Sequence, residues 1–437
     1  MKKMKDSGIE WIGQIPEDWN IKRLKAVLCE RNESNNPIKT DYILSLTNDR
    51  GVIPYDEKGD VGNKSKEDVS GYKLAYPNDI VLNSMNVIIG SVALSKYYGC
   101  VSPVYYMLYP RNPMDDVRYY NYIFQTKEFQ SKLKGYGNGI MEIRMRIQMS
   151  KLNTVELPIP DATTQTRIAD FLDEKCGKID RYIEKQQQVI EKLKAYKQSV
   201  ITEAVTKGLN PDVPMKDSGI EWIGRIPENW GVAKLANLFA FLGGYAFNSD
   251  LYVSETENLI VRIGNVKNDR LLFDANPVYI SDDLAEQVIK FKLQCGDILF
   301  TMTGTKGKRD YFYTLILDDS HIQTKNLYLN QRVGCFRKKA HIHAEYYNYL
   351  LKDNRILDSI FLYETGTANQ GNLGIDSINR TKVHLPPYDE QIMIANYLKD
   401  KCSRIDAVIA KKEVAINKST EYKKSLIYEA VTGKLEV

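Results

Sequence analysis

Apolar residues recur at intervals of three, four and seven positions in two stretches of the chain, with Lys, Glu and Gln between them. Such spacing puts the apolar side chains on one face of an α-helix. The pattern predicts two long amphipathic helices, at 165–207 and 391–433, with prolines just before each of them. Because each helix has a single apolar stripe, we expect the two helices to pair antiparallel and bury these stripes against each other. The apolar positions are Ile179, Ile183, Ile190, Leu193, Tyr196, Val200, Ile201 and Ala204 in the first helix, and Ile405, Ile409, Ile416, Tyr422, Leu426, Ile427 and Ala430 in the second.

The segments at 20–156 and 231–384 have a different pattern. Short runs of β-branched and aromatic residues alternate there with Gly, Asn, Asp and Pro, which is typical of strands joined by turns. Near the end of each segment a helical pattern follows, at 119–133 and 346–361. We therefore expect two mixed α/β lobes, the first lobe and the second lobe, with strands at their centres. The strand-like runs are YILSLT, DIVLNSMNVIIGSVAL, NLIVRIGNV, GDILFTMTG and LNQRVGCF.

The chain contains two internal repeats. Residues 4–20, MKDSGIEWIGQIPEDWN, return at 215–231 as MKDSGIEWIGRIPENWG, with 14 of 17 positions identical and an offset of 211. The helical stretches repeat at an offset of 226, which aligns Gln165 with Gln391 and Cys176 with Cys402. All four tryptophans lie in the first repeat, so we expect them to anchor it on other elements. A chain duplicated in this way predicts an internal pseudo-two-fold axis.

Length and composition fit a multidomain protein. A chain of 437 residues exceeds what one core usually organises, and we divide it into segments 1–156, 157–211, 212–384 and 385–437. The net charge of +4 limits any nucleic-acid surface to local patches. The six cysteines lack metal-ligand spacing, and no stretch reaches the roughly 20 apolar residues of a membrane span. We therefore expect no metal site, no membrane segment and a reducing, cytoplasmic location.

The order of the segments, the SGIEWIGxIPExW repeat and the LPxPxxxxQxxIAxxLxxKxxxID start of each helix resemble the specificity subunits of type I restriction-modification enzymes. The resemblance covers essentially the whole chain. It implies an α+β fold of two target recognition domains joined by two long helices that pack as an antiparallel coiled coil. It also implies that the two domains bind the two halves of an asymmetric, interrupted site in double-stranded DNA. The helices would dock two modification subunits, and restriction subunits would complete the complex.

The same resemblance implies that this chain binds no cofactor and catalyses no reaction. S-adenosylmethionine and adenine methylation would belong to the modification subunits, and ATP and Mg would be bound by the partner subunits for ATP hydrolysis and cleavage. Helices of about 30 residues would extend on the order of 45 Å, a little more than the ~34 Å of one duplex turn. A strut of this length would hold the two lobes on successive major grooves.

Candidate DNA contacts are polar residues of glycine-rich loops and strand ends, because amide and guanidinium groups read base edges and cations bind phosphates. Each of them is also a common turn or surface residue, so the prediction concerns the lobes before any single residue. The candidates of the first lobe are Asn83, Ser84, Asn86, Arg144 and Arg146. The candidates of the second lobe are Tyr245, Arg262, Asn265, Thr303, Lys306, Lys308, Arg309, Gln331, Thr367, Asn369, Gln370 and Asn372.

Two other classes of protein remain as alternatives. LPPYDE at 385–390 is similar to the NPPY motif of amino-methyltransferases, but Leu385 stands where that motif needs Asn. GTKGKR at 304–309 lacks the spacing and the Ser or Thr of a phosphate-binding loop. A scaffold that binds only proteins would account for the helices and leave two unlike lobes unexplained. Methylation of DNA by the chain alone, or with a modification subunit, distinguishes the three classes.

Overall fold

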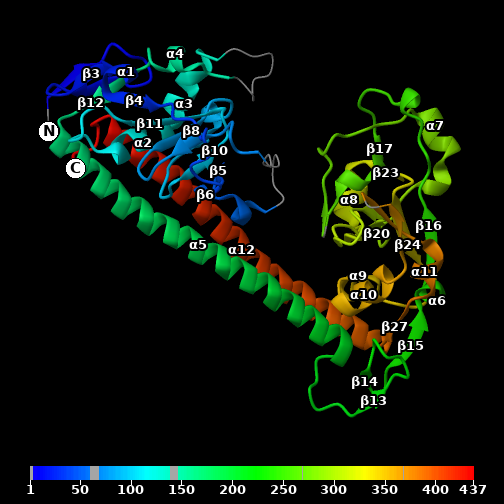
Figure 1. The fold of residues 1–437 in the computed structure, drawn as a ribbon. Helices are drawn as coiled ribbons and strands as arrows, with labels where there is room; N and C mark the ends of the chain where they lie inside the picture. Colours follow the sequence, from blue (N-terminus) through cyan, green and yellow to red (C-terminus); the bar gives the residue numbers. More distant parts are fainter. Residues whose placement is uncertain (1–2, 60–67, 138–145, 268, 368) are drawn as a thin grey trace. The chain divides into compact units, whose positions relative to one another are not determined.

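The computed structural model describes residues 3–59, 68–137, 146–267, 269–367 and 369–437. Contacts divide the chain into two units: unit 1 consists of Met1–Gln188 and Lys412–Val437, and unit 2 consists of Val189–Lys411. Each unit contains one lobe and a part of each long helix, α5 (Ala162–Lys207) and α12 (Tyr388–Val431) (Figure 1). None of the helices in the described ranges is long and apolar enough to cross a membrane. The four-segment division made from the sequence stays a prediction.

The lobe of unit 1 is built on an antiparallel four-stranded sheet with the order β4-β11-β8-β9. Strand β12 pairs with β3, so the end of the lobe returns to its beginning. The remaining pairs are β1-β2, β5-β6 and β7-β10. The elements are β1 (Met4–Asp6), β2 (Gln14–Pro16), β3 (Asn20–Arg23), α1 (Leu24–Val27), β4 (Leu28–Arg31), β5 (Leu44–Thr47), β6 (Gly51–Pro54), β7 (Lys73–Ala75), β8 (Ile80–Asn83), β9 (Val92–Leu94), β10 (Gly99–Val101), β11 (Tyr105–Pro110), α2 (Val117–Gln125), α3 (Lys127–Lys134), α4 (Met149–Leu152) and β12 (Glu156–Ile159).

The lobe of unit 2 has a four-stranded antiparallel sheet of corresponding design, with the order β16-β24-β20-β22. A parallel pair β17-β23, a hairpin β18-β19 and a three-stranded sheet β21-β26-β25 accompany it. The elements are β13 (Met215–Asp217), β14 (Arg225–Pro227), β15 (Gly231–Lys234), α6 (Leu235–Leu238), β16 (Phe239–Gly243), β17 (Asn258–Val261), β18 (Val266–Lys267), β19 (Arg270–Leu271), α7 (Asp282–Gln287), β20 (Ile298–Thr301), β21 (Thr303–Gly304), β22 (Thr314–Ile316), α8 (Asp319–Thr324), β23 (Asn326–Leu329), β24 (Val333–Lys338), α9 (Ala344–Leu350), α10 (Asn354–Phe361), β25 (Glu364–Thr367), β26 (Gln370–Leu373), α11 (Ile375–Arg380) and β27 (Lys382–Leu385).

The helical pattern near the end of each lobe forms two short helices instead of one. In unit 1 the side chain of Thr126 accepts a hydrogen bond from the backbone of Phe129 and caps α3. In unit 2 the side chain of Asp353 accepts a hydrogen bond from the backbone N–H of Arg355 and caps α10. A capping side chain satisfies a free backbone N–H and starts a new helix, so each pattern breaks at that residue.

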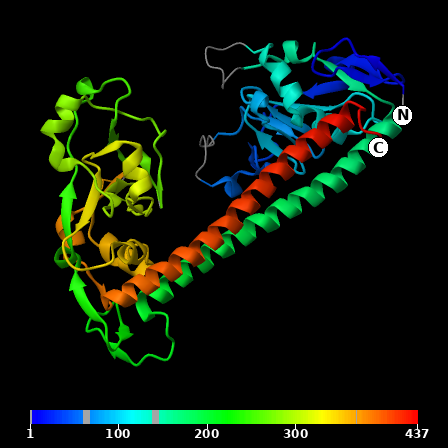
Figure 2. The same ribbon diagram turned by 180° about the vertical axis from the view of Figure 1, so that it is seen from behind.

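The long helices complete the core of each lobe. In unit 1, α12 contributes residues such as Ile427 and Val431, and the hydroxyl of Tyr119 donates to the carbonyls of Pro158 and Val431, at 2.7 and 3.0 Å. In unit 2, α5 takes this place, and the hydroxyl of Tyr346 donates to the carbonyl of Val205 at 3.1 Å. The last turn of α12 therefore completes the unit that contains the chain's first residues, and both termini lie there (Figure 2).

Within each unit the two helix segments run antiparallel. In unit 1, Lys423 contacts Asp180 at 2.7 Å and Lys412 contacts Gln186 at 2.8 Å, so partner numbers fall as residue numbers rise. In unit 2, Lys197 contacts Asp406 at 2.6 Å.

Packing of the helices as a coiled coil stays a prediction. The expected burial of one stripe against the other is partly wrong: Tyr196 and Tyr422 are 53% and 61% exposed. Val200 and Ile201 of α5, and Leu426 and Ile427 of α12, pack in the lobe cores instead.

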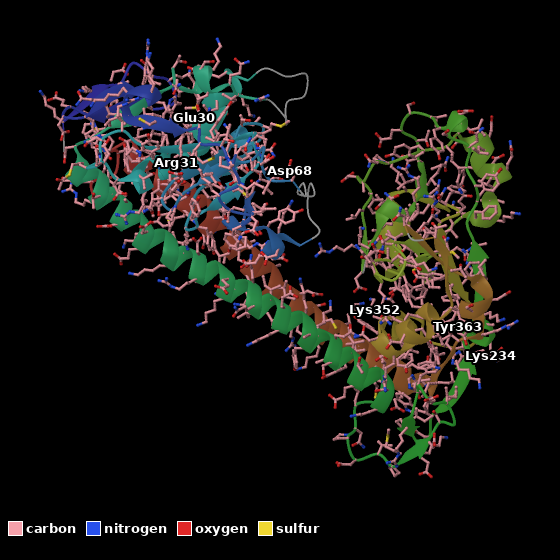
Figure 3. The ribbon with its side chains drawn as sticks, in the orientation of Figure 1. Glu30, Arg31, Asp68, Lys234, Lys352 and Tyr363 are labelled. Carbon is pink, nitrogen blue, oxygen red and sulfur yellow. The ribbon has the colours of Figure 1, made fainter. Side chains whose placement is uncertain are left out.

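A buried aspartate begins the central strand of each lobe. Asp79, before β8, accepts two hydrogen bonds from the guanidinium of Arg31. The Arg31 guanidinium also lies over the rings of Tyr76 and Tyr109; Figure 3 labels Arg31. Asp297, before β20, accepts two hydrogen bonds from Arg337, at 2.9 and 2.6 Å. The hydrogen bond to the aspartate raises the pKa of each arginine, because it stabilises the charged guanidinium.

Candidate nucleic-acid interface

The central strand of each lobe ends at a junction with the same backbone hydrogen bonds. After β8, Ser84 N–H donates to the carbonyl of Val104, and the carbonyl of Ser84 accepts from Ile147 at 2.9 Å. After β20, Met302 N–H donates to Arg332, and its carbonyl accepts from Leu373 at 3.2 Å. Ser84 and Met302 therefore occupy equivalent places in the two lobes.

In the first lobe this junction borders an open cleft of about 1000 Å³. Asn83 and Asn86, both predicted from the sequence, line it, as does Asp68, which Figure 3 labels in this lobe. Three further segments contribute polar groups that the sequence analysis missed. They are Thr47 at the end of β5 with Asn48 and Arg50 of the following turn, Lys58, and Ser102 before β11 with Tyr105 at its start.

The TNDR turn at 47–50 carries the residue types expected of a DNA contact. Such residues are also common in ordinary surface turns, so no local signal distinguishes this turn. Arg50 is about half exposed, and its guanidinium donates to the carbonyl of Glu57 at 2.9 Å, which holds it at the side of the cleft.

In the second lobe, two loops that are far apart in the sequence form one surface. Strand β21 pairs with β26, which places Thr303 opposite Asn372, and β25 pairs with β26, which places Thr367 opposite Gln370. The ammonium of Lys306 donates to the carbonyl of Gly366 at 2.9 Å and fixes the first loop to the second. Lys308 and Asn369 are exposed on the same loops, and Arg309 is paired with Asp358.

Tyr245, Gln331 and Arg262 meet at the neighbouring strand ends. The backbone N–H of Tyr245 donates to Leu329 at 2.8 Å, and that of Gln331 donates to Tyr245 at 3.0 Å. Arg262 follows β17 directly, and its guanidinium donates to the carbonyl of Asn276. The Tyr245 ring, 37% exposed, makes an edge contact with Phe247 and a tilted contact with Phe291.

Two candidates are engaged inside their lobes. Ser84 is fully buried, and its hydroxyl donates to the carbonyl of Val104 at 2.7 Å. Asn265 is 1% exposed, and its amide bonds the backbone of Arg262, Leu272 and Ala275. Because a base contact would break these buried bonds, we assign both residues a structural role and leave them out of the interface.

The last two candidates of the first lobe lie before α4. Arg146 is exposed and directly precedes Ile147, as Asn372 directly precedes Leu373 in the second lobe. Arg144 lies outside the described residues.

A family model described as the type I restriction modification DNA specificity domain matches residues 16–195 and 227–418. The chain belongs to this family. It is a type I specificity subunit, a DNA-recognition component that is not catalytic. It is similar to the MjaVIII specificity subunit of Methanocaldococcus jannaschii, with 25% identity over 97% of this chain and 94% of the relative.

Other comparisons agree with this assignment. The EcoKI specificity subunit of Escherichia coli K12 is 20% identical over 97% of this chain and 90% of its own length. A solved structure from work on complex assembly and conformational transition of the type I R-M system superposes with a TM-score of 0.70 at 12% identity, covering 96% of this chain and 99% of that one. This superposition supports the mixed α/β fold of the specificity subunit with its two specificity domains.

Proposed function

We propose that each lobe of this specificity subunit reads one half of a bipartite, asymmetric DNA target at its strand-end junction. The observation that carries the proposal is the equivalence of the two junctions, which have the same backbone connections and different polar side chains. Asn83 and Asn86 face the cleft of the first lobe, whereas Gln331, Thr303 and Asn372 surround the junction of the second. Because hydrogen-bonding groups determine which base edge fits, unlike side chains on a common scaffold predict unlike half-sites.

The two long helices, as a coiled-coil spacer related by a pseudo-two-fold axis, would set the distance between half-sites and dock two modification subunits. Exposed apolar side chains support this role, because they recur at the repeat offset of 226: Tyr182 with Val408, and Tyr196 with Tyr422. A surface presented twice fits two copies of one partner. Restriction subunits would join this complex. S-adenosylmethionine, ATP and Mg would be bound by the partners, and this chain would bind no cofactor.

Mapping of methylated adenines tests the reading of DNA by each lobe. We expect the chain with its modification subunit to methylate a split site with unlike halves. Asn83→Ala should lower methylation about tenfold or more at the native site and relax the sequence of one half only, and Gln331→Ala should affect the other half, since a good base contact contributes about 1–3 kcal/mol. Asn112→Ala is the control, because Asn112 is exposed in the first lobe outside the cleft.

Three results would contradict the proposal. Methylation by the chain alone would indicate intrinsic catalysis. An absence of sequence-dependent methylation with the partner present would favour a protein-binding scaffold. Identical inverted halves in the methylation map would refute the assignment of one unlike half-site to each lobe.

A further inference from the structure

Near the start of each long helix, a glutamine bonds the backbone of the lobe and the backbone just before the helix, an arrangement called here the glutamine clamp. Gln165 accepts from the backbone of Asp116 at 3.1 Å and donates to the carbonyl of Pro160 at 3.2 Å. Gln391 accepts from the backbone of His343 at 2.9 Å and donates to the carbonyl of Pro386 at 2.8 Å. Each glutamine is 1% exposed. The clamp therefore sets α2 on α5 and α9 on α12 in the same way, so the next turns of each helix face equivalent lobe residues.

At the next contact the charges are reversed between the two units. In unit 1, Arg118 of α2 pairs with Asp173 and Asp170 of α5, at 2.6 and 2.8 Å. In unit 2, Glu345 of α9 pairs with Lys399 of α12 at 3.3 Å. Arg118 and Glu345 both directly precede a YYNY sequence, and Asp173 and Lys399 are 226 positions apart. The same position of the lobe is thus cationic in unit 1 and anionic in unit 2, and the helix carries the opposite charge each time.

Two further interactions strengthen the asymmetry in unit 1. The hydroxyl of Tyr122 donates to Asp173 at 2.6 Å, and Arg118 also pairs with Asp116 at 2.6 Å. Arg118 is one-third exposed and faces three carboxylates. A cation at this position is therefore better stabilised than one in an isolated surface pair.

The contacts between the helices keep the same sign in both units. Asp180 of α5 pairs with Lys423 of α12 in unit 1, and Asp406 of α12 pairs with Lys197 of α5 in unit 2. These pairs occupy equivalent positions, at the repeat offset of 226. The two copies therefore share the charge pair between the helices and differ in sign where each lobe contacts its helix.

We propose that these reversed charges match each lobe to the helix that follows it, so that a lobe transferred to the other position keeps its charge pair only if its helix is transferred with it through residue 173 or 399. A copy of the second lobe in the first position would place its glutamate beside Asp170 and Asp173. A copy of the first lobe in the second position would place its arginine beside Lys399. Each arrangement puts like charges together and loses the native pair. This matching concerns how each lobe docks on its helix, so it does not rest on the function proposed above.

Charge exchange in the full-length chain tests the matching. Arg118→Glu alone should lower the thermal unfolding midpoint of unit 1 by about 3 °C or more, and Asp170→Asn with Asp173→Lys should lower it similarly. The triple variant, which carries the charges of unit 2 at positions 118, 170 and 173 and keeps Asp116, should recover at least half of either loss. This recovery of the unfolding midpoint should be smaller at 1 M salt, because charges are then screened over about 3 Å. Hydrogen exchange of α2, Val117–Gln125, reports the same changes locally.

A chimaera provides the second test. Residues 231–385 replace residues 20–159, so that β15 and β27 take the places of β3 and β12 in equal register. In this chain Asp170→Asn with Asp173→Lys should raise the unfolding midpoint, whereas the same substitutions lower it in the native chain. A shift of the same sign in both chains, or no recovery in the triple variant, would overturn the proposal. Loss of DNA recognition without these shifts would bear on the proposed function instead.

Discussion

Protonation of His384 should destabilise unit 2 in mild acid. The imidazole, on β27, is 1% exposed, and neither ring nitrogen has a hydrogen-bond partner among the described residues. The rings of Trp222 and Trp230 lie edge-on to it, with centroids 6.5 and 6.0 Å away. Burial, and then the positive charge of Arg355, lower the pKa of His384 from 6.5 to about 4. The strand register places Pro158 at the equivalent position of unit 1, so that unit lacks an ionisable side chain there.

The size of the effect follows from the difference between the two pKa values. The unfolded chain takes up a proton near pH 6.5 and the folded chain only near pH 4, so between these values the unfolded state binds more protons and stability falls as the pH is lowered. A difference of about 2.5 units corresponds to about 3 kcal/mol in full, of which about 2 kcal/mol is lost by pH 5. At pH 7.5 the contribution of His384 is fully present.

Urea unfolding of the full chain at pH 7.5 and pH 5, followed by tryptophan fluorescence, measures this loss. His384→Leu should reduce the pH dependence of the unfolding free energy of unit 2 by about 2 kcal/mol. His341→Leu is the matched control, because His341 is exposed in the same unit, and it should leave the dependence unchanged. An equal pH dependence in the native chain and in His384→Leu would refute the reasoning.

Three further changes test other parts of the structure. Asp297→Asn should cost about 2 kcal/mol in urea unfolding, because it leaves the partly buried Arg337 without its carboxylate, whereas Asp318→Asn at an exposed position should cost much less. Gly244→Ala should reduce recognition of the second half-site in the methylation map, because a Cβ there would lie 2.0 Å from the carbonyl oxygen of Asn330 and displace Tyr245; Gly264→Ala, with open space around it, should not. Tyr119→Phe should cost about 1–3 kcal/mol, because it removes the buried donor to Pro158 and Val431, and a cost equal to that of Tyr196→Phe, at an exposed position, would contradict this role.

The elements that the sequence predicts well are those with a local signal. The helices expected at 165–207 and 391–433 are found at Ala162–Lys207 and Tyr388–Val431, because their apolar spacing and the prolines before them act over a few residues. The prolines of LPPYDE belong to such a helix start, where Gln391 bonds the carbonyl of Pro386. The breaks at Thr126 and Asp353 escaped prediction, because a capping residue interrupts the helix without interrupting its apolar pattern.

The candidate site was less accessible to prediction, because it depends on contacts between distant segments. Pairing of Thr303 with Asn372 joins residues that no local pattern connects. Ser84 and Asn265 have the composition of contact residues, yet their burial follows from backbone groups that reach them from other segments.

Comparison of the two units separates positions that must stay alike from positions that must differ. The glutamine clamp and the aspartate–lysine pairs between helices are the same in both, and they set geometry common to two readers. Side chains at the strand-end junctions differ, which the reading of unlike half-sites requires. The reversed charges of Arg118 and Glu345 fall on neither the junction nor the helix pair. Recognition of DNA does not explain why these charges are reversed. Matching of each lobe to its own helix explains it.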